Sequence, residues 1–451
     1  MSTVDPGKLE TEKIGRLLWQ YSVPAVVATM ATSLYNVVDR VFIGQGAGSM
    51  AISGLALCFP IMTLIQAFGT LVGVGASSKI SIVLGMNDKD WAERILGNAI
   101  LLTFVIWACI CTSCLFFLDP LLRLFGGSEQ TIPYASAYLK IIIPGSIFSN
   151  LAYSYSNIIR ASGSPGKSMQ FMLIGVGANV ILDPLFIFGL NMGIEGAAYA
   201  TVISMFISAC FTMQFFMGQK TYIRFHRQKI RMRSSTIKDI VSIGLSPFLM
   251  NVAASVVNII LNNKLHNYGG DLAIGAYGII NSYAILFVMF VIGICQGMQP
   301  IVGYNYGAGK IERSKKALFL AFYAATVVTT FGFILIELAP AFMAGLFTKD
   351  IELINITKTG LRIVFLLHPL LGFQIVTGNF FQSIGKAKLS IFLSLTRQVL
   401  FLIPALYICS SFWGLSGVWG AIPVADGLSV LLAIYILNRQ FFWNKSSQLK
   451  D

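Results

Sequence analysis

The sequence predicts an all-α polytopic membrane protein with twelve transmembrane helices in two six-helix lobes, related by a pseudo-twofold axis along the membrane normal. Three observations support this prediction. Only 11% of the 451 residues are charged, against about 25% in ordinary soluble domains. The apolar stretches are continuous instead of alternating, which disfavours a β-barrel. The two sides of a central polar segment also repeat each other.

Each predicted helix is an apolar stretch of about 20 residues or more, which is long enough to cross a bilayer. These stretches are bounded by Gly, Pro, Asn or charged residues. In chain order they cover residues 16–44, 51–82, 92–118, 133–160, 168–190, 196–218, 238–265, 272–304, 316–338, 353–382, 388–410 and 415–437. The seven cysteines fall inside apolar runs, and we interpret them as small packing residues.

The net charge of +13 follows the predicted topology. Most of the 32 basic residues, among them Arg160, lie in segments on one side of the predicted helices, whereas the outer loops hold only Arg123, Lys264 and Lys349. Because loops rich in Lys and Arg stay in the cytoplasm, both termini are expected there. Membrane lipids, and not nucleic acid, are therefore the expected surroundings of the basic residues.

The longest polar stretch, residues 219–237, divides the chain at its midpoint. It predicts a cytoplasmic basic linker between an N-terminal lobe (1–218) and a C-terminal lobe (238–451), in preference to a nucleic-acid or anionic-lipid site. Pro24 matches Pro247, Gly75 matches Gly297, and GIEGAAYA from Gly193 matches GLSGVWGA from Gly414, always 221 to 223 residues apart. Transporters with parallel repeats of this kind bind their substrate between the halves and alternate access.

Two acidic residues lie inside the predicted helices, where an ionised carboxylate costs about 2.5 to 3.5 kcal/mol on insertion scales. In helix 1, Tyr35 and Asn36 precede Asp39 by four and three residues, so the three share one helical face. In helix 5, Asn179 lies four residues before Asp183. Pro184 follows directly and frees a carbonyl one turn earlier for a ligand or water.

Four helices place polar groups at a similar predicted depth, at about 1.5 Å per residue. These groups are Asp39, Asp183, Thr201 about one turn into helix 6, and Tyr138 at a similar distance into helix 4. The plainer interpretation is that Asp39 marks a helix end and Asp183 a locally bonded kink. Coincident depth favours a shared site, which would take up a proton or bind a cation such as sodium.

A second pair of buried charges lies in the C-terminal lobe. Arg397 in helix 11 and Asp426 in helix 12 both fall near mid-membrane on consecutive helices. We expect a structural ion pair or a water-bridged contact, with the charged atoms less than about 6 Å apart. The alternative is that each side chain faces the central cavity separately.

Catalytic chemistry has no support in this sequence. His226, His266 and His368 are scattered, and no nucleophile, base and orienting group occur together. The GKS of GSPGKS lacks the first P-loop glycine and a preceding strand, so ATP is not implied. Neither a resident metal nor an organic cofactor is expected.

Several motifs together resemble the multidrug and toxic compound extrusion (MATE) family, in its DinF-like branch. They are YNVVDRVFIG from Tyr35, RASGSPGKS from Arg160, NVILDPLFIFG from Asn179, GIEGAAYAT from Gly193 and QPIVGYNYGAG from Gln299. The resemblance implies two six-helix lobes around a V-shaped cavity. It also implies export of amphipathic, often cationic compounds in exchange for H⁺ or Na⁺, by a functional monomer in a bacterial inner membrane.

Carried over residue by residue, the resemblance assigns three groups of side chains. The cation or proton site would be Asp39, Asn179, Asp183 and Thr201; the cavity walls would be Tyr35, Asn36, Tyr138 and Asn157; and Pro24 would be a conformational kink in helix 1. The rival function is a flippase of lipid-linked saccharides, which would need several cavity Arg or Lys residues to hold pyrophosphate. Only Arg397 qualifies. A channel or a purely structural membrane protein would show no ion coupling.

Overall fold

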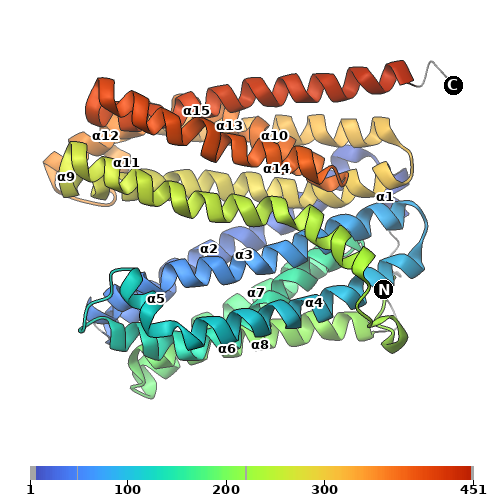
Figure 1. The fold of residues 1–451 in the computed structure, drawn as a ribbon, viewed down its shortest axis with the longest axis horizontal. Helices are drawn as coiled ribbons and strands as arrows, with labels where there is room; N and C mark the ends of the chain where they lie inside the picture. The colour runs from blue at the N-terminus through green and yellow to red at the C-terminus, as the bar shows by residue number, and fades with distance from the viewer. Residues whose placement is uncertain (1–6, 48, 219–220, 448–451) are drawn as a thin grey trace.

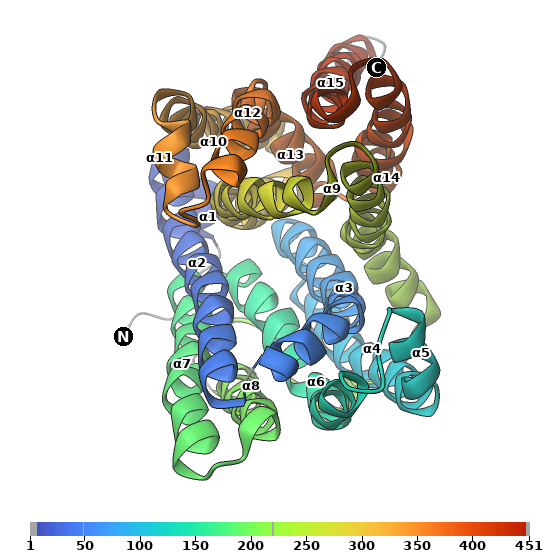
Figure 2. The ribbon, with the colours of Figure 1, turned by 90° about the vertical axis from the view of Figure 1, so that its left-hand side faces the viewer.

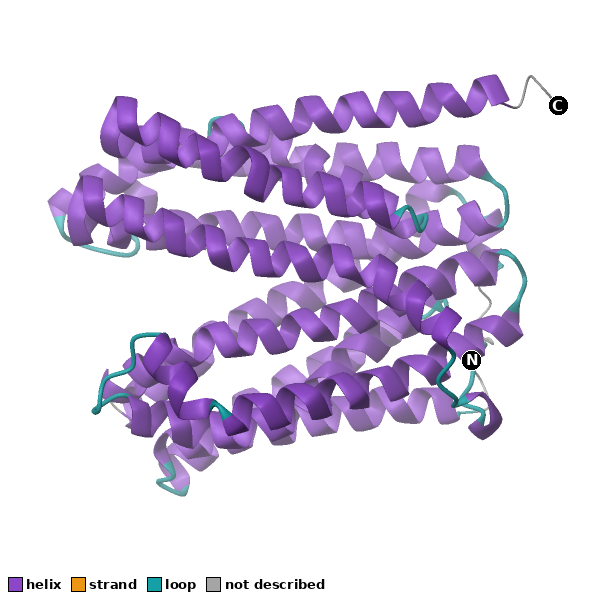
Figure 3. Cartoon of the chain, in the orientation of Figure 1, coloured by secondary structure: helices purple, strands orange, loops and turns teal. Residues whose placement is uncertain are grey.

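The computed structural model describes residues 7–47, 49–218 and 221–447. These residues form helices and short connections without any strand, as predicted (Figure 3). Residues 1–6, 48, 219–220 and 448–451 lie outside the described residues. The extreme ends of the two predicted lobes and the start of the predicted linker are therefore not described.

The first half of the chain ends with a helix that stops just before the predicted linker. Its helices are α1 (Lys8–Thr11), α2 (Ile14–Ala47), α3 (Ser49–Gly85), α4 (Lys89–Phe116), α5 (Leu118–Leu124), α6 (Ile132–Ala161), α7 (Pro165–Pro184), the π-helix η1 (Leu185–Gly189) and α8 (Gly193–Met217). Six of these, α2, α3, α4, α6, α7 and α8, coincide with the six predicted apolar stretches.

The second half begins after the short 3₁₀ helix η2 (Arg227–Lys229) in the linker. Its helices are α9 (Ser234–Gly307), α10 (Ile311–Leu338), α11 (Pro340–Gly345), α12 (Ile351–Phe365), α13 (His368–Ser383), α14 (Ala387–Leu395), the π-helix η3 (Thr396–Leu402) and α15 (Ile403–Ser447). The tenth predicted helix is thus divided into α12 and α13.

Single glycines bend the two longest helices where the sequence predicts separate spans. Gly270 in α9 and Gly414 in α15 have φ of 63° and 55°, a left-handed conformation that favours glycine. Among the described residues, eight helices are long and apolar enough to cross a membrane, or nine if α12 and α13, bent by 51°, form one span. This count treats each glycine-bent helix as one, and the number twelve stays a prediction.

The backbone repeats the pattern found in the sequence. Gly163 and Gly385 occupy equivalent positions and both have positive φ, 100° and 75°. Gly193 and Gly414 are also equivalent, with φ of 56° and 55°. The two halves therefore make the same tight turns at the same places.

The two halves form separate helix groups that meet at one end of the molecule. In Figure 1 the blue-to-green helices of the first half lie below the yellow-to-red helices of the second half, and Figure 2 shows the two groups end-on. We call the end that carries α1, the α3–α4 turn and the α9–α10 turn the inner end; the opposite one is the outer end. At the inner end Lys310 of the α9–α10 turn pairs with Glu10 of α1 at 2.6 Å.

Glycines allow the backbones of the two halves to touch at the inner end. A Cβ atom added to Gly85 would lie 2.0 Å from the carbonyl oxygen of Tyr304, and one added to Gly307 would lie 1.9 Å from that of Ile82. Gly307 lies 222 positions after Gly85, and Tyr304 lies 222 positions after Ile82, so the two contacts exchange equivalent positions of the two halves. The inner end is therefore closed by a pair of repeat-related backbone contacts.

We expect Gly307→Ala to destabilise the closed inner end by about 1 to 3 kcal/mol, the usual cost of overpacking. The added methyl group has no flexible neighbour to displace, because the facing atom is a backbone oxygen. Thermal unfolding in detergent measures this effect. Gly166→Ala at the start of α7 is the control, since nothing lies within 4 Å of its added Cβ; equal melting temperatures for the two variants would contradict the prediction.

The described part of the basic linker packs against α4. Glu93 is 4% exposed and accepts hydrogen bonds from the Arg224 backbone N at 3.2 Å and from Lys229 Nζ at 2.6 Å. Asn98 accepts one from the Arg233 backbone N at 2.8 Å. The segment that leads into the second half is thus fastened to the first.

Candidate functional site

A buried polar cluster lies between α7 and α8, near the outer end. Asn179 Nδ2 donates to Asp183 Oδ1 at 3.1 Å, one turn further along α7, and to Thr201 Oγ1 of α8 at 3.4 Å. Their exposed fractions are 3%, 1% and 3% for Asn179, Asp183 and Thr201. The four-residue spacing and the turn at Gly193 bring these three predicted residues together.

Asp39 of α2 completes the cluster from a third helix. It is 8% exposed, and its carboxyl group lies near enough to that of Asp183 for the two to interact electrostatically. Two neighbouring buried carboxyl groups are not both ionised unless a cation lies between them; without one, at least one of them keeps its proton. The plainer interpretation of Asp39 as a helix-end residue is therefore wrong, because α2 continues to Ala47 and the side chain faces inward.

Three buried oxygens of this cluster have no hydrogen-bond donor. They are Asp39 Oδ1, Asn179 Oδ1 and Asp183 Oδ2. A buried acceptor without a partner costs about 1 to 3 kcal/mol, so three in one cluster indicate a site built for a ligand that supplies positive charge. Oxygen acceptors of this kind suit a proton or a hard cation.

The backbone after Asp183 departs from the regular helix. Pro184 has no N–H to donate, and the next residues form the π-helix η1, where Leu190 N bonds to Leu185 O at 2.9 Å. Single π-helical turns inside α-helices occur often at functional sites. Pro184 thus lies where the sequence predicted an interrupted helix.

The predicted cavity residues occupy different environments. Tyr35 is partly buried on α2, one helical turn before Asp39. Asn36 is exposed on α2. Tyr138, predicted as a cavity wall, is only 1% exposed and belongs to a hydrophobic core cluster, so in this structure it does not line an open cavity.

Two predicted residues lie far from the acid cluster. Pro24 lies inside α2, fifteen residues before Asp39, or about 22 Å along the helix. Asn157 is 6% exposed in the inner part of α6, where its Oδ1 accepts a hydrogen bond from Arg160 Nη2 at 3.4 Å. These two positions lie toward the inner end, away from the acid cluster.

Arg160 lies at the end of the fourth predicted helix, among the basic residues that the sequence predicts to lie on the inner side. In the structure α6 ends one residue later, at Ala161, and Arg160 is only 3% exposed. Two other basic groups of the inner end, Lys79 and Lys310, are more exposed and pair with acids.

The second half holds the other buried charges. Arg397 Nε of η3 donates to Asp426 Oδ1 of α15 at 2.7 Å, which is inside the 6 Å limit set by the sequence prediction. Their side chains are 16% and 5% exposed. His368, which looked isolated in sequence, is 4% exposed and packs on Phe365 with ring centres 4.4 Å apart.

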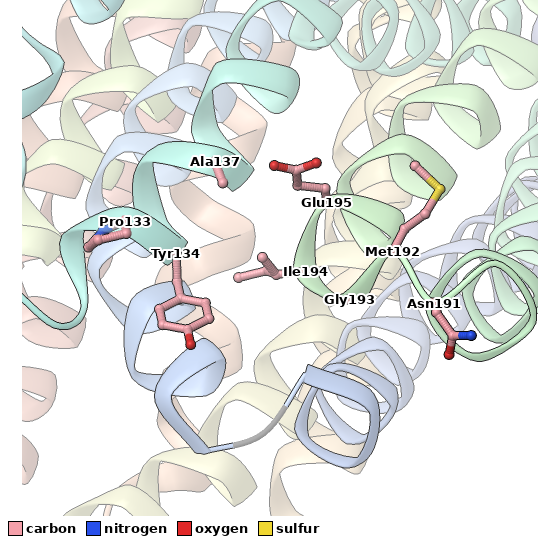
Figure 4. A pocket seen from close by; sticks show the side chains of 8 residues that line it. All are labelled: Pro133, Tyr134, Ala137, Asn191, Met192, Gly193, Ile194 and Glu195. Atoms are coloured by element: carbon pink, nitrogen blue, oxygen red, sulfur yellow. The ribbon is translucent and has the colours of Figure 1, made fainter.

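One open pocket of about 380 Å³ lies at the outer end of the first half. As Figure 4 shows, Tyr134 and Ala137 of α6 form one side, while Met192, Ile194 and Glu195 at the start of α8 form the other. The pocket lies about one helical turn outward from Tyr138 on α6. Among the described residues no group of three or more His, Cys, Asp or Glu could hold a metal ion, either here or elsewhere.

Comparisons with known proteins agree with the repeat. The family model MatE matches the chain twice, over residues 24–185 and 247–408. The chain is 27% identical to the multidrug export protein MepA of Staphylococcus aureus (strain MSSA476) over 428 residues, covering 95% of this chain and 94% of that protein. It is 28% identical over 428 residues to MepA of Staphylococcus haemolyticus (strain JCSC1435), with the same coverage.

Solved structures share the fold. One is the outward-facing conformation of a multidrug resistance MATE family transporter of the MOP superfamily, with a TM-score of 0.93 and 24% identity over 99% of this chain and all of that one. Another is a MOP superfamily transporter from Pyrococcus furiosus, described as having a binding pocket of reverse polarity, with a TM-score of 0.91 and 24% identity over the full length of both chains.

Proposed function

Because the chain belongs to the MatE family, whose model it matches in both halves, we propose that it exports amphipathic, often cationic compounds in exchange for a coupling cation. The MepA relatives are named as multidrug export proteins, which supports small drug-like molecules as the cargo. Export against a gradient requires a group that binds the coupling ion in one conformation and releases it in another.

The observation that carries this proposal is the acid cluster with its three unpartnered oxygens. Asp39 comes from α2, while Asn179 and Asp183 come from α7. When the cation leaves, repulsion between the two carboxylates favours a movement of α2 relative to α7. Cation binding thereby acts on the helix that also reaches the second half, where Ser22 Oγ donates to Ile294 O at 3.4 Å.

Of the two candidate coupling ions, the small number of free oxygens favours a proton over sodium. The cluster has three unpartnered buried oxygens; a proton shared by two neighbouring carboxyl groups needs no more, whereas a hard metal cation is usually held by about six oxygens or more. Pro24, one of the residues that the family resemblance assigns, lies between the inner end of α2 and Asp39 and supplies a weak point in the helix ladder.

The proposal also includes the oligomeric state, the membrane and the orientation of the protein in it. The protein acts as a monomer in a bacterial inner membrane, surrounded by lipid, with the inner end and both termini in the cytoplasm. The basic residues at the inner end support this orientation. The flippase alternative is not favoured, because Arg397 is paired with Asp426 and is unable to join a pyrophosphate site without leaving a buried acid unpaired.

The coupling ion is tested with opposed gradients in proteoliposomes. We expect a pH gradient imposed in sodium-free buffer to drive transport of a fluorescent cationic dye, and a sodium gradient at constant pH to drive none. Dye movement that follows only the sodium gradient would assign sodium to the cluster. Liposomes without protein control for passive partition of the dye.

A further inference from the structure

A buried guanidinium joins the two halves at the inner end without a carboxylate partner. Arg160 Nη1 of α6 donates to Gln296 Oε1 of α9 at 2.5 Å, and Nη2 donates to Asn157 Oδ1 at 3.4 Å. Both acceptors are neutral amides. Within the described part of the chain, no ion pair involves Arg160, which is 3% exposed.

Gln296 lies among other contacts between the halves. On the same helix, Ser22 of α2 reaches the carbonyl of Ile294, and Gln299 Nε2 donates to Ser81 Oγ of α3 at 3.3 Å. A Cβ atom on Gly297 would lie 2.4 Å from Ser22 Oγ. The surface around Gln296 therefore separates when the inner end opens, and the bond to Arg160 has to break.

Other charged contacts between the halves differ from this one. Lys79 of α3 pairs with Asp239 of α9 at 3.1 Å, but that carboxylate is 37% exposed. Water can replace either partner there, so the pair is weak. Arg160 has no such replacement while it is buried, and a hydrogen bond from a charged donor is stronger than one between neutral groups.

The neutral character of both acceptors has a mechanical consequence. Asn157 is on the same helix as Arg160, three residues earlier, so it moves with the guanidinium and stays its partner when the halves separate. Gln296 is left behind as an uncharged amide, whereas a carboxylate at this position would form an ion pair with the guanidinium, which holds more strongly than a bond to a neutral acceptor. An amide thus holds the contact while permitting it to open.

Only the first half carries a positively charged side chain at this position of the repeat. The position equivalent to Arg160 in the second half, 222 residues later, is Gln382 of α13, which is 6% exposed. The backbone contacts of Gly85 and Gly307 are repeated in both halves, but the charged contact is not. The Arg160 bond is therefore an addition to the symmetric closure.

We propose that Arg160 and Gln296 form a latch that holds the inner end closed, and that the uncharged amide of Gln296 sets its strength so that it opens in each transport cycle. This inference rests on the proposed function, because it assumes that the inner end opens. Arg160 is here a positioning residue, which acts on the equilibrium between two conformations and not on the substrate.

Two variants of Gln296 test the latch in opposite directions. The side chain is partly exposed, so substitution is tolerated. Gln296→Glu places a carboxylate against the guanidinium and is expected to lower the population open at the inner end at least tenfold. Gln296→Leu removes the acceptor and is expected to raise it. Transport turnover should fall in Gln296→Glu by a similar factor.

The readout is the distance distribution between spin labels at Lys167→Cys of α7 and Lys316→Cys of α10, in a background without the native cysteines. Both positions are exposed and belong to different halves. The matched control is Gln440→Glu, because Gln440 also accepts from a cation, Lys386 Nζ at 2.6 Å, but within the second half. Control and wild-type distributions should coincide.

Two results would overturn the latch. One is a Gln296→Glu distribution equal to that of the Gln440→Glu control; the other is a shift of Gln296→Glu and Gln296→Leu in the same direction. The Arg160→Gln/Gln296→Glu double variant should lose the effect of the new carboxylate. The spin-label distances are measured without any ion gradient. If the proposed ion coupling is wrong, these distances are unaffected. If the latch is wrong, gradient-driven transport by the wild-type protein is unaffected.

Discussion

The Asp39→Asn variant is expected to lose ion-driven transport by about 5- to 150-fold, the usual range of coupling between two sites, while remaining folded. Asparagine has nearly the size of aspartate and still offers an oxygen to the cluster. It removes one of the two carboxyl groups whose mutual repulsion responds to the cation. The variant should bind the exported compound but no longer move it against a gradient.

Transport and binding measured on the same preparation separate these two effects. Dye accumulation driven by a pH gradient should fall, while the equilibrium affinity for the dye in detergent should change by less than the transport rate. Asp119→Asn is the matched control, since Asp119 is exposed at the start of α5. Undiminished gradient-driven transport by Asp39→Asn would remove the acid pair from the mechanism.

Asp183→Asn should produce the same loss, and the double variant should be no worse than either single variant. Residues that act as one unit show such non-additive effects. The electrostatic interaction between the two neighbouring carboxyl groups and the bond from Asn179 to Asp183 make them one unit here. Losses that multiply in the double variant would instead indicate two independent sites.

The helix pattern allowed much of this cluster to be predicted. A four-residue spacing puts Asn179 and Asp183 on one face whatever the tertiary fold, and depth counting placed Asp39 and Thr201 at the same level. The helical spacing does not show which neighbouring helix each polar face packs against. Tyr138 therefore lay at the predicted depth but in the core, and Asn157 lay with Arg160 at the inner end.

The breaks at Gly270 and Gly414 were predicted, but their form was not. At each of them a single left-handed residue turns the chain, with no separate loop between the two helices. At Arg160 the predicted end of the helix was right to within one residue, but the burial of the side chain was not predicted. Burial of a base depends on amide partners such as Gln296, 136 residues later in the chain.

The second large effect is expected at the charge pair of the second half. Asp426→Leu should destabilise the protein by about 3 to 5 kcal/mol, because it leaves the buried guanidinium of Arg397 without its counter-charge. The double variant Arg397→Met/Asp426→Leu should recover most of this loss, since an apolar pair of similar volume has no charge to desolvate. Thermal unfolding of the three proteins in one detergent measures both steps.

The exposed fractions of the two side chains predict which single variant, Asp426→Leu or Arg397→Met, is the less stable. Arg397 is 16% exposed and Asp426 only 5%, so partial hydration of the guanidinium places the loss in Asp426→Leu nearer to the lower value. Arg397→Met leaves the more deeply buried charge unpaired and should cost more than Asp426→Leu. If both single variants are as stable as the double variant, the 2.7 Å contact contributes nothing to folding. Arg397 would then be retained for contact with the transported compound, which the double variant would fail to export.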